Sequence, residues 1–181
     1  MAHAILTAIG VDRAGLVDEV SSFIYDRGGN IEDSRMVNLR GQFVIVVLLG
    51  GDEATIGKLR HEQSQLASMS GLQVEVRPTP DQPGIPPGAA ASAAGALPFR
   101  FVATAVDRPG IVHEISHLLR EMSVNIESLE TRLSPAPYTG SPVFEMEAVL
   151  AAPRKTPVNE LRKRLGALCD EMNVDWELTR A

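Results

Sequence analysis

Cysteine is nearly absent from this sequence, because Cys169 is the one cysteine among 181 residues. A single thiol cannot form an intramolecular disulfide, and it cannot supply the cysteine cluster of a zinc site. The first residues also lack a basic stretch leading into an apolar core, so no secretory signal is predicted. These features favour a reducing, cytoplasmic location. We expect Cys169 to lie in a hydrophobic core rather than to act as a nucleophile.

Aromatic residues and surplus positive charge are scarce as well. Aromatic residues make up 4% of the chain, and the net charge is −6. Residues 1–77 carry 7 basic and 10 acidic side chains, and residues 99–181 carry 10 and 12. Few aromatic side chains are available to stack on bases, and neither half of the chain carries an excess of positive charge. Direct binding of nucleic acid is therefore not expected. No apolar run approaches the roughly 20 residues that span a bilayer, so no membrane partner is expected either.

Proline, glycine and alanine are concentrated in one segment, residues 78–98. These 21 residues hold six of the twelve prolines, three glycines, six alanines and a single charged residue, Asp81. Because proline removes a backbone donor and glycine adds chain entropy, this composition is typical of a linker. We therefore predict two domains, residues 1–77 and 99–181, joined by residues 78–98.

The two flanking segments repeat each other. At a shift of 95 positions, residues 11–17 (VDRAGLV) align with residues 106–112 (VDRPGIV), and residues 30–32 (NIE) align with residues 125–127 (NIE). Ten of the 22 positions from 11 to 32 are identical between the copies. Two copies of one structural unit follow from this internal similarity.

Hydrophobic periodicity predicts the order strand, helix, strand, strand, helix, strand in each copy. The first copy is predicted to have strands at 4–11, 30–39, 42–49 and 72–77, with helices at 16–27 and 53–68. The second is predicted to have strands at 99–106, 124–133, 143–151 and 174–178, with helices at 111–122 and 157–172. A longer, protruding hairpin is expected at residues 134–142.

This order indicates an α+β fold made of two ferredoxin-like units. In each, a four-stranded antiparallel sheet carries two helices on one face and leaves the other face bare. Residues 43–49 and 148–151 are apolar at consecutive positions, so both faces of these strands require cover. We expect the two copies, or two chains, to pack against each other as an intramolecular pair or a homodimer. Edge-to-edge pairing into an eight-stranded sheet is the alternative.

The segments Asp12-Arg13-Ala14-Gly15-Leu16-Val17 and Asp107-Arg108-Pro109-Gly110-Ile111-Val112, each followed by a helix and an Asn-Ile-Glu strand start, resemble the ACT domain. The tandem layout is similar to that of the glycine cleavage system regulators, a family of two-ACT transcriptional repressors without a catalytic domain. This resemblance implies binding of a small effector, often an amino acid, where the turn after the first strand faces a neighbouring domain. It also implies action on a protein partner such as a transcription activator.

The residues of this turn suit a zwitterion without reference to the family. Gly15 and Gly110 allow close backbone approach, and the following helix N-terminus offers unpaired N–H groups to a carboxylate. Asp12 and Asp107 are suited to an ammonium group, although a helix cap is the structural alternative for each of them. Asn30 and Asn125 begin the next strand, and we expect them near the same end of the sheet.

The candidate ligand-binding residues are thus the two turns and the two strand starts: Asp12, Arg13, Ala14, Gly15, Leu16, Val17, Asn30, Ile31, Asp107, Arg108, Pro109, Gly110, Ile111, Val112, Asn125 and Ile126. Arg13 and Arg108 either hold a carboxylate or are solvated. Because Ala14 stands where the second copy has Pro109, the first turn is expected to be less rigid and its site weaker.

One competing motif is present at residues 113–117, where His113-Glu114-Ile115-Ser116-His117 matches H-E-x-x-H. On a helix, His113 and His117 would share a face and Glu114 could act as a base, as in a zinc hydrolase. The equivalent segment of the first copy, residues 18–22 (DEVSS), contains no histidine. We therefore expect an exposed polar helix face and no metal.

These observations predict a non-catalytic regulatory protein that binds a small amino acid such as glycine. No cofactor and no catalytic residue are expected. By the resemblance, its role would be transcriptional control of the glycine cleavage system. A protein interaction module without a metabolite ligand is the alternative.

Overall fold

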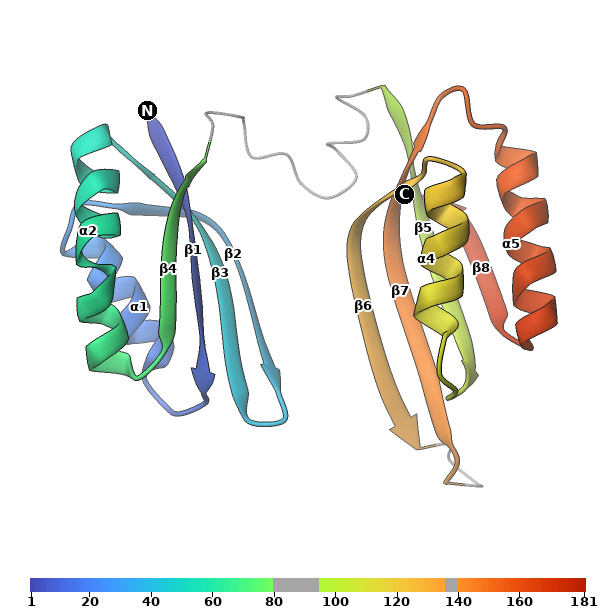
Figure 1. The fold of residues 1–181 in the computed structure, drawn as a ribbon, viewed down its shortest axis with the longest axis horizontal. Coiled ribbons are helices and arrows are strands. Elements are labelled where there is room, and N and C mark those ends of the chain that lie inside the picture. Colours follow the sequence, from blue (N-terminus) through green and yellow to red (C-terminus); the bar gives the residue numbers. More distant parts are fainter. Residues whose placement is uncertain (80–94, 136–139) are drawn as a thin grey trace. The chain divides into compact units, whose positions relative to one another are not determined.

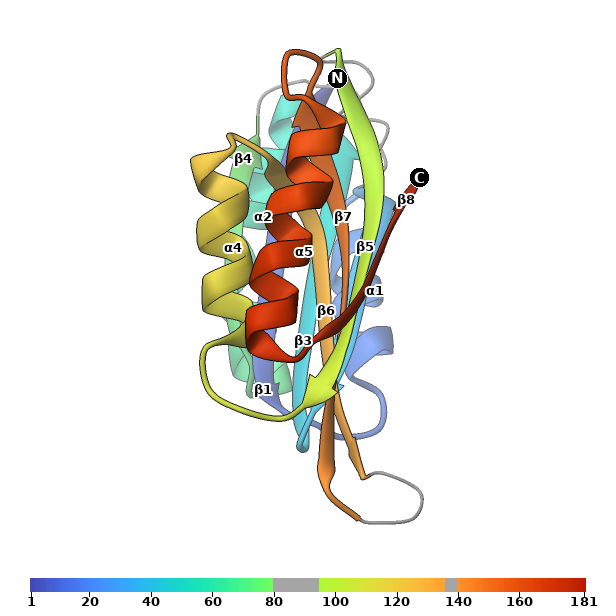
Figure 2. The same cartoon turned by 90° about the vertical axis from the view of Figure 1, so that its right-hand side faces the viewer.

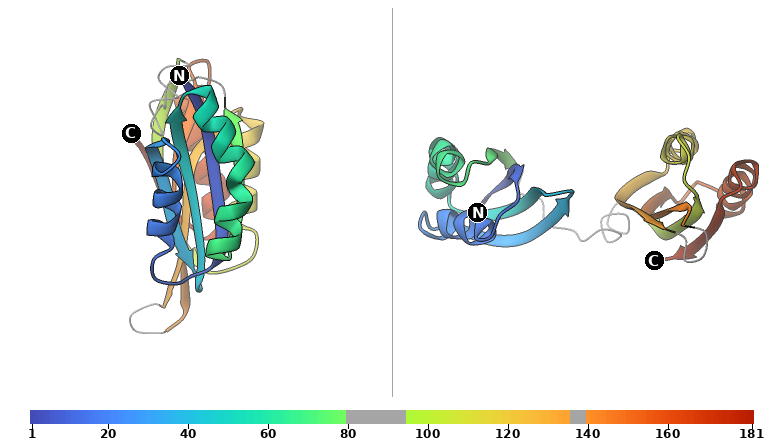
Figure 3. Two further views of the ribbon diagram at one scale, coloured as in Figure 1. Left: turned by 90° about the vertical axis from the view of Figure 1, so that its left-hand side faces the viewer. Right: turned by 90° about the horizontal axis from the view of Figure 1, so that it is seen from below.

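Each half of the chain forms a four-stranded antiparallel sheet with two helices packed on one face (Figures 1 and 2). The computed structural model describes residues 1–79, 95–135 and 140–181, and the chain divides into the units Met1–Gly84 and Ile85–Ala181. Figure 3 shows the helices of each unit on one side of its own sheet. The predicted ferredoxin-like α+β fold is confirmed in both copies.

The first unit contains β1 (Ala2–Val11), α1 (Leu16–Tyr25), β2 (Asn30–Leu39), β3 (Gln42–Gly51), α2 (Glu53–Ser70) and β4 (Gln73–Thr79). The second contains β5 (Ala96–Val106), α4 (Ile111–Glu121), β6 (Asn125–Pro135), β7 (Pro142–Pro153), α5 (Val158–Met172) and β8 (Asp175–Arg180). The strand orders are β2-β3-β1-β4 and β6-β7-β5-β8. Each central strand therefore lies between two antiparallel neighbours.

Strands occupy both ends of the segment predicted as a linker. β4 extends through Thr79 and β5 begins at Ala96, while the predicted linker residues 80–94 lie outside the described residues. The predicted hairpin at 134–142 is also partly strand, since β6 runs to Pro135 and β7 begins at Pro142. Residues 136–139 of that hairpin are not among the described residues.

The two units have separate hydrophobic cores. The first core joins residues from Ala4 to Val76, and the second joins residues from Phe99 to Leu178. Cys169 is fully buried in the second core, as predicted. Burial, together with the charge of Asp170, raises the pKa of the Cys169 thiol to about 11, so the thiol stays protonated at neutral pH.

No helix in the described part of the chain has the length and apolarity needed to cross a membrane.

The separate cores predict that a core truncation in one unit leaves the packing of the other intact. Leu59 and Leu161 are both fully buried, one in each core. Leu59→Ala or Leu161→Ala should lower the stability of its own unit by about 2–5 kcal/mol. The single tryptophan, Trp176, stacks on Phe101 with ring centroids 6.4 Å apart, so its fluorescence reports the second unit.

Urea titrations that follow Trp176 fluorescence and far-ultraviolet circular dichroism together check this expectation. Leu161→Ala should move the midpoint of the fluorescence transition to lower urea. Leu59→Ala should leave that midpoint unchanged and move only the part of the dichroism transition that comes from the first unit to lower urea. An equal shift of the fluorescence midpoint by both variants would contradict separate cores.

Candidate functional site

Both strand-to-helix turns have the same backbone conformation. Gly15 and Gly110 are the N-cap residues of α1 and α4, with φ of 94° and 100°. Positive φ is costly for residues with a Cβ, which explains the glycine at this position of both copies. Neither helix start has a side-chain cap hydrogen bond. The suggestion that Asp12 caps the helix is therefore wrong, because the chain reverses through Gly15 before the helix begins.

The helix starts leave backbone N–H groups without a side-chain acceptor, and the turn residues before them are exposed. Asp12 to Gly15 and Asp107 to Gly110 are exposed, whereas the side chains of Leu16 and Ile111 are buried in the cores. Leu16 and Ile111 can therefore offer a ligand their backbone N–H groups and not their side chains. The next residues differ, since Val17 is exposed and Val112 packs partly against the second core.

Helix α2 shows how a carboxylate behaves at a helix start in this chain. The Asp52 carboxylate accepts a hydrogen bond from the Thr55 backbone N–H at 2.6 Å. This hydrogen bond holds the pKa of Asp52 below its ordinary value. Helices α1 and α4 lack such a group, so a carboxylate from a ligand could take the equivalent place.

The first turn is closed by an internal ion pair. The Arg13 guanidinium donates to both carboxylate oxygens of Glu19, at 2.6 and 2.8 Å, and to the Ser70 carbonyl oxygen at 3.2 Å. The hydrogen bond from Arg13 holds the pKa of Glu19 below its ordinary value. Arg13 is thus neither simply solvated nor available to a ligand without giving up Glu19.

Asp12 also has a partner in the first unit. Its carboxylate accepts a hydrogen bond from the side-chain amide of Asn38, and the Asn38 amide oxygen accepts one from the Gly41 backbone N–H. The strand registers place Leu133 at the position of Asn38 in the second unit, opposite Phe144. The Asp107 carboxylate therefore has no equivalent amide beside it.

The second turn leaves its arginine open. Glu114 occupies the place of Glu19 in the repeat, yet within the described residues Arg108 makes no hydrogen bond or ion pair with it or with any other group. Pro109 restricts the backbone beside Arg108. Of the two turns, the second presents a guanidinium and a carboxylate that are both accessible.

The predicted position of Asn30 and Asn125 is wrong. Asn30 lies opposite Gly50, which lies opposite His3 at the start of β1, whereas the turn follows the other end of β1 at Val11. Asp12 follows His3 by nine residue steps along the strand, which is about 30 Å. Asn125 lies opposite Ala151 and is equally far from the second turn. Ile31 and Ile126 follow the asparagines at this far end of each sheet.

The glutamates of the two Asn-Ile-Glu segments have different partners, because Ala151 and Pro98 stand in the second unit where the first has Gly50 and His3. Glu32 lies across Gly50, where a Cβ would stand 2.2 Å from its carboxylate oxygen, and approaches the His3 ring at 3.3 Å. In the second unit Ala151 occupies the position of Gly50. Glu127 instead accepts a hydrogen bond from the Asn125 side-chain amide at 2.8 Å.

A depression of about 380 Å³ lies beside Asn125 at the end of α4. It is lined by Ser116, Arg120, Ser123, Val124, Asn125 and Ile126. Sequence reasoning missed Ser116 and Arg120, because their proximity to Asn125 depends on where α4 ends. It also missed the pairing of Glu19 with Arg13, although Glu19 and Glu114 are identical in the two copies and could have drawn attention.

The two histidines of the H-E-x-x-H segment lie on the exposed face of α4. His113 and His117 lie on α4 with ring centroids 6.1 Å apart, and His117 approaches Glu121 at 3.3 Å. Glu121 is also paired with Arg164 at 2.6 Å. In the part of the chain that the structure describes, no group of three or more His, Cys, Asp or Glu side chains could hold a metal ion.

The cap at Asp52 generates a pH-dependent prediction. Because the pKa of Asp52 is lowered by folding, its stabilisation is complete above the unfolded pKa near 4 and is lost as pH falls through the folded pKa. Asp52→Ala should therefore lower the midpoint of thermal unfolding at pH 7, and the difference from wild type should shrink toward pH 3. Asp52→Ser keeps a hydrogen-bond acceptor, so its midpoint of thermal unfolding should fall by less. A difference in midpoint between wild type and Asp52→Ala that is independent of pH would contradict the cap.

Comparison with known proteins gives the same architecture. The ACT domain family model matches residues 2–77. The glycine cleavage system transcriptional repressor of Escherichia coli is 23% identical over 176 residues, which are 97% of this chain and 88% of the repressor. The UPF0237 protein MK1213 of Methanopyrus kandleri is 38% identical over 79 residues, covering 42% of this chain and 88% of that protein.

A solved structure of a protein of unknown function from Galdieria sulphuraria has the tandem arrangement in full. It superimposes with a TM-score of 0.78 and 26% identity over 99% of this chain and 98% of its own. Three findings agree on a repeated ACT-type fold. They are the family match in the first unit, the same strand order in the second, and the similarity to other proteins over the whole chain. Residues 2–77 belong to the ACT domain family, the second unit repeats that fold, and the chain is similar over its length to a glycine cleavage system transcriptional repressor.

Proposed function

We propose that this chain is a non-catalytic regulatory protein whose ACT units bind a small amino acid and thereby alter its docking on another protein. The observation that carries the proposal is the repeated turn, in which a left-handed glycine precedes a helix start with no capping side chain. A carboxylate suits the backbone N–H groups of this helix start, and the nearby aspartate suits an ammonium group.

The second turn is the stronger candidate site. Arg108 can reach a ligand carboxylate without breaking an internal ion pair, whereas Arg13 is held by Glu19. The rigid Pro109 lowers the entropy cost of ordering this turn on binding. Glycine is the first ligand to test, because the E. coli relative is named for the glycine cleavage system.

The asparagines enter the site only if another ACT unit supplies them. Within one unit, turn and asparagine lie at opposite ends of the sheet. A neighbouring unit that runs in the opposite direction would bring its Asn-containing strand start toward the turn. This arrangement would enclose a ligand that the exposed turn of one unit leaves open to solvent.

The proposed output is regulation through a protein partner, such as a transcription activator, rather than direct DNA contact. The net charge of −6 and the acidic balance of both halves oppose binding to a phosphate backbone. A ligand can shift such a partner equilibrium only through its different affinity for the two states of the protein.

Isothermal titration of the full chain with glycine, alanine, serine and aspartate tests ligand binding. We expect heat from at least one small amino acid. Arg108→Ala should weaken that binding about tenfold or more, because it removes a charged hydrogen bond. Arg13→Ala is the matched control and should change the affinity by less, since Arg13 is engaged with Glu19.

Absence of heat with every amino acid, for protein shown to be folded, would refute the proposal and leave a protein interaction module. A larger loss from Arg13→Ala than from Arg108→Ala would refute the assignment of the second turn as the stronger site.

A further inference from the structure

The strand registers align the two units residue by residue. Gly10 lies opposite Phe43 in the first unit, and its repeat partner Ala105 lies opposite Phe144 in the second. The pairs Ile9 with Val44 and Thr104 with Glu145 follow at the next positions. Positions on β1 and β2 therefore correspond to β5 and β6 at a shift of 95, and positions on β3 correspond to β7 at a shift of 101.

This alignment shows that the two sheets differ in chemistry at six positions on the face away from the helices, while Thr7 and its counterpart Val102 differ in the reverse sense. On the helix side, the central strands of both sheets carry buried apolar residues. On the open face, six apolar residues of the first unit correspond to six polar or charged residues of the second. The pairs are Ile5 and Arg100, Ile9 and Thr104, Val37 and Arg132, Leu39 and Ser134, Val44 and Glu145, and Val46 and Glu147.

The open face of the first sheet leaves large apolar side chains in water. Ile9 is 44% exposed, Val37 46% and Leu39 65%, and they adjoin the partly exposed Val46. These residues come from β1, β2 and β3, which pair side by side, with Ile9, Val44 and Val37 opposite one another and with Thr7 and Arg35 beside Val46. An exposed apolar surface of this kind marks an interaction site.

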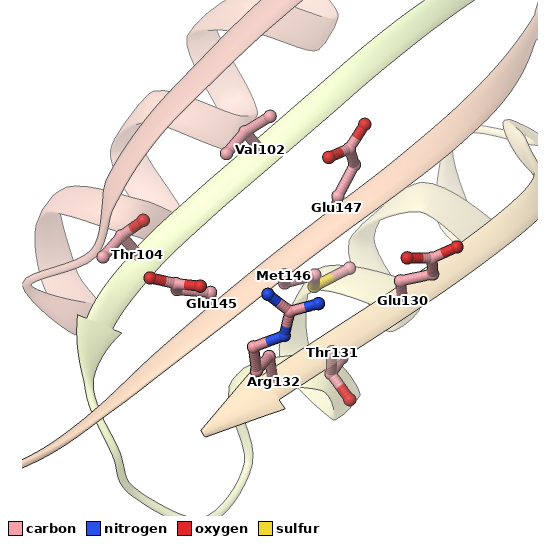
Figure 4. Close-up of a pocket in the computed structure, with 8 residues that line it drawn as sticks. All are labelled: Val102, Thr104, Glu130, Thr131, Arg132, Glu145, Met146 and Glu147. Atoms are coloured by element: carbon pink, nitrogen blue, oxygen red, sulfur yellow. The ribbon is translucent and has the colours of Figure 1, made fainter. Parts of the chain in front are cut away.

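The open face of the second sheet is suited to water. Figure 4 shows Glu130, Arg132, Glu145 and Glu147 around a depression of about 340 Å³ on β6 and β7. Glu147 forms an exposed ion pair with Arg100 at 2.6 Å. With Asp175 and Glu177 of β8 opposite Thr104 and Val102, this face carries more carboxylates than guanidinium groups. The charged side chains of this face reduce its need for the cover that the sequence predicts for both copies.

Charge identifies the partner of the apolar face. Its two edge strands each carry one acid and one base in an ion pair, Asp33 with Arg35 on β2 and Glu75 with Arg77 on β4. The face thus has an apolar centre and a neutral rim of both signs, so it complements itself across a twofold axis. The acidic face of the second unit would instead place carboxylates against the apolar centre, which is unfavourable.

We propose that two copies of this chain form a homodimer through the open faces of their first units, with β1 and β3 of each chain at the centre. The surface is separate from the strand-to-helix turns, so the dimer forms without an amino acid. Failure of ligand binding and failure of dimerisation are therefore distinguishable.

The second unit supplies the design of the test. Val46→Glu introduces the residue that Glu147 already provides at the equivalent position, so the sheet can accommodate it. In sedimentation velocity of the ligand-free full chain at micromolar concentration, wild type should be a dimer. Val46→Glu should raise the dimer dissociation constant by about 100-fold or more, because a carboxylate is placed in an apolar interface.

Two further variants keep the result interpretable. Thr104→Glu adds the same charge to the open face of the second unit and should leave the dimer unchanged. Ile9→Thr copies Thr104 and should weaken the dimer without adding charge, which covers the case in which Val46→Glu does not fold by circular dichroism. A monomeric wild type, a folded Val46→Glu that remains dimeric, or an equal effect of Thr104→Glu would each overturn the proposal.

Discussion

Strand direction is the constraint on which the rest of each unit depends. β1 and β2 both pair antiparallel with β3, so they run in the same direction, and α1 has to return along the whole length of the sheet between them. The glycine turn therefore lies at one end of the unit and the Asn-Ile-Glu strand start at the other. The turn and the strand start occur in both copies of the repeat, but within one ACT unit they cannot contact the same ligand.

The same fold supports different surfaces because burial fixes one face of a strand and leaves the other free. Core-facing positions stay apolar in both copies, whereas the open faces have become apolar in one and charged in the other. Single residues also change local contacts. The glutamate beside Gly50 approaches His3, whereas the second unit has Ala151 and Pro98 at these positions, and its glutamate accepts a hydrogen bond from an asparagine. The duplication thus supplies one scaffold with two sets of contacts.

Much of this organisation can be predicted from the sequence. The repeat around Gly15 and Gly110, together with the hydrophobic periodicity, predicts the element order and the fold. The position of Asn30 could have been predicted too, since a strand-helix-strand crossover between parallel strands starts the second strand at the same end of the sheet as the first. Other features require the register. Val46 and Glu147 are recognised as equivalents only when the strand pairs are known, and the free state of Arg108 depends on side-chain positions.

The central proposal is that a small amino acid binds at the strand-to-helix turn of an ACT unit. A crystal structure of the full chain grown with saturating glycine tests it most directly. The account predicts the glycine carboxylate on the backbone N–H groups that follow Gly110, with an asparagine from a second unit completing the site. Glycine bound away from both turns would contradict it.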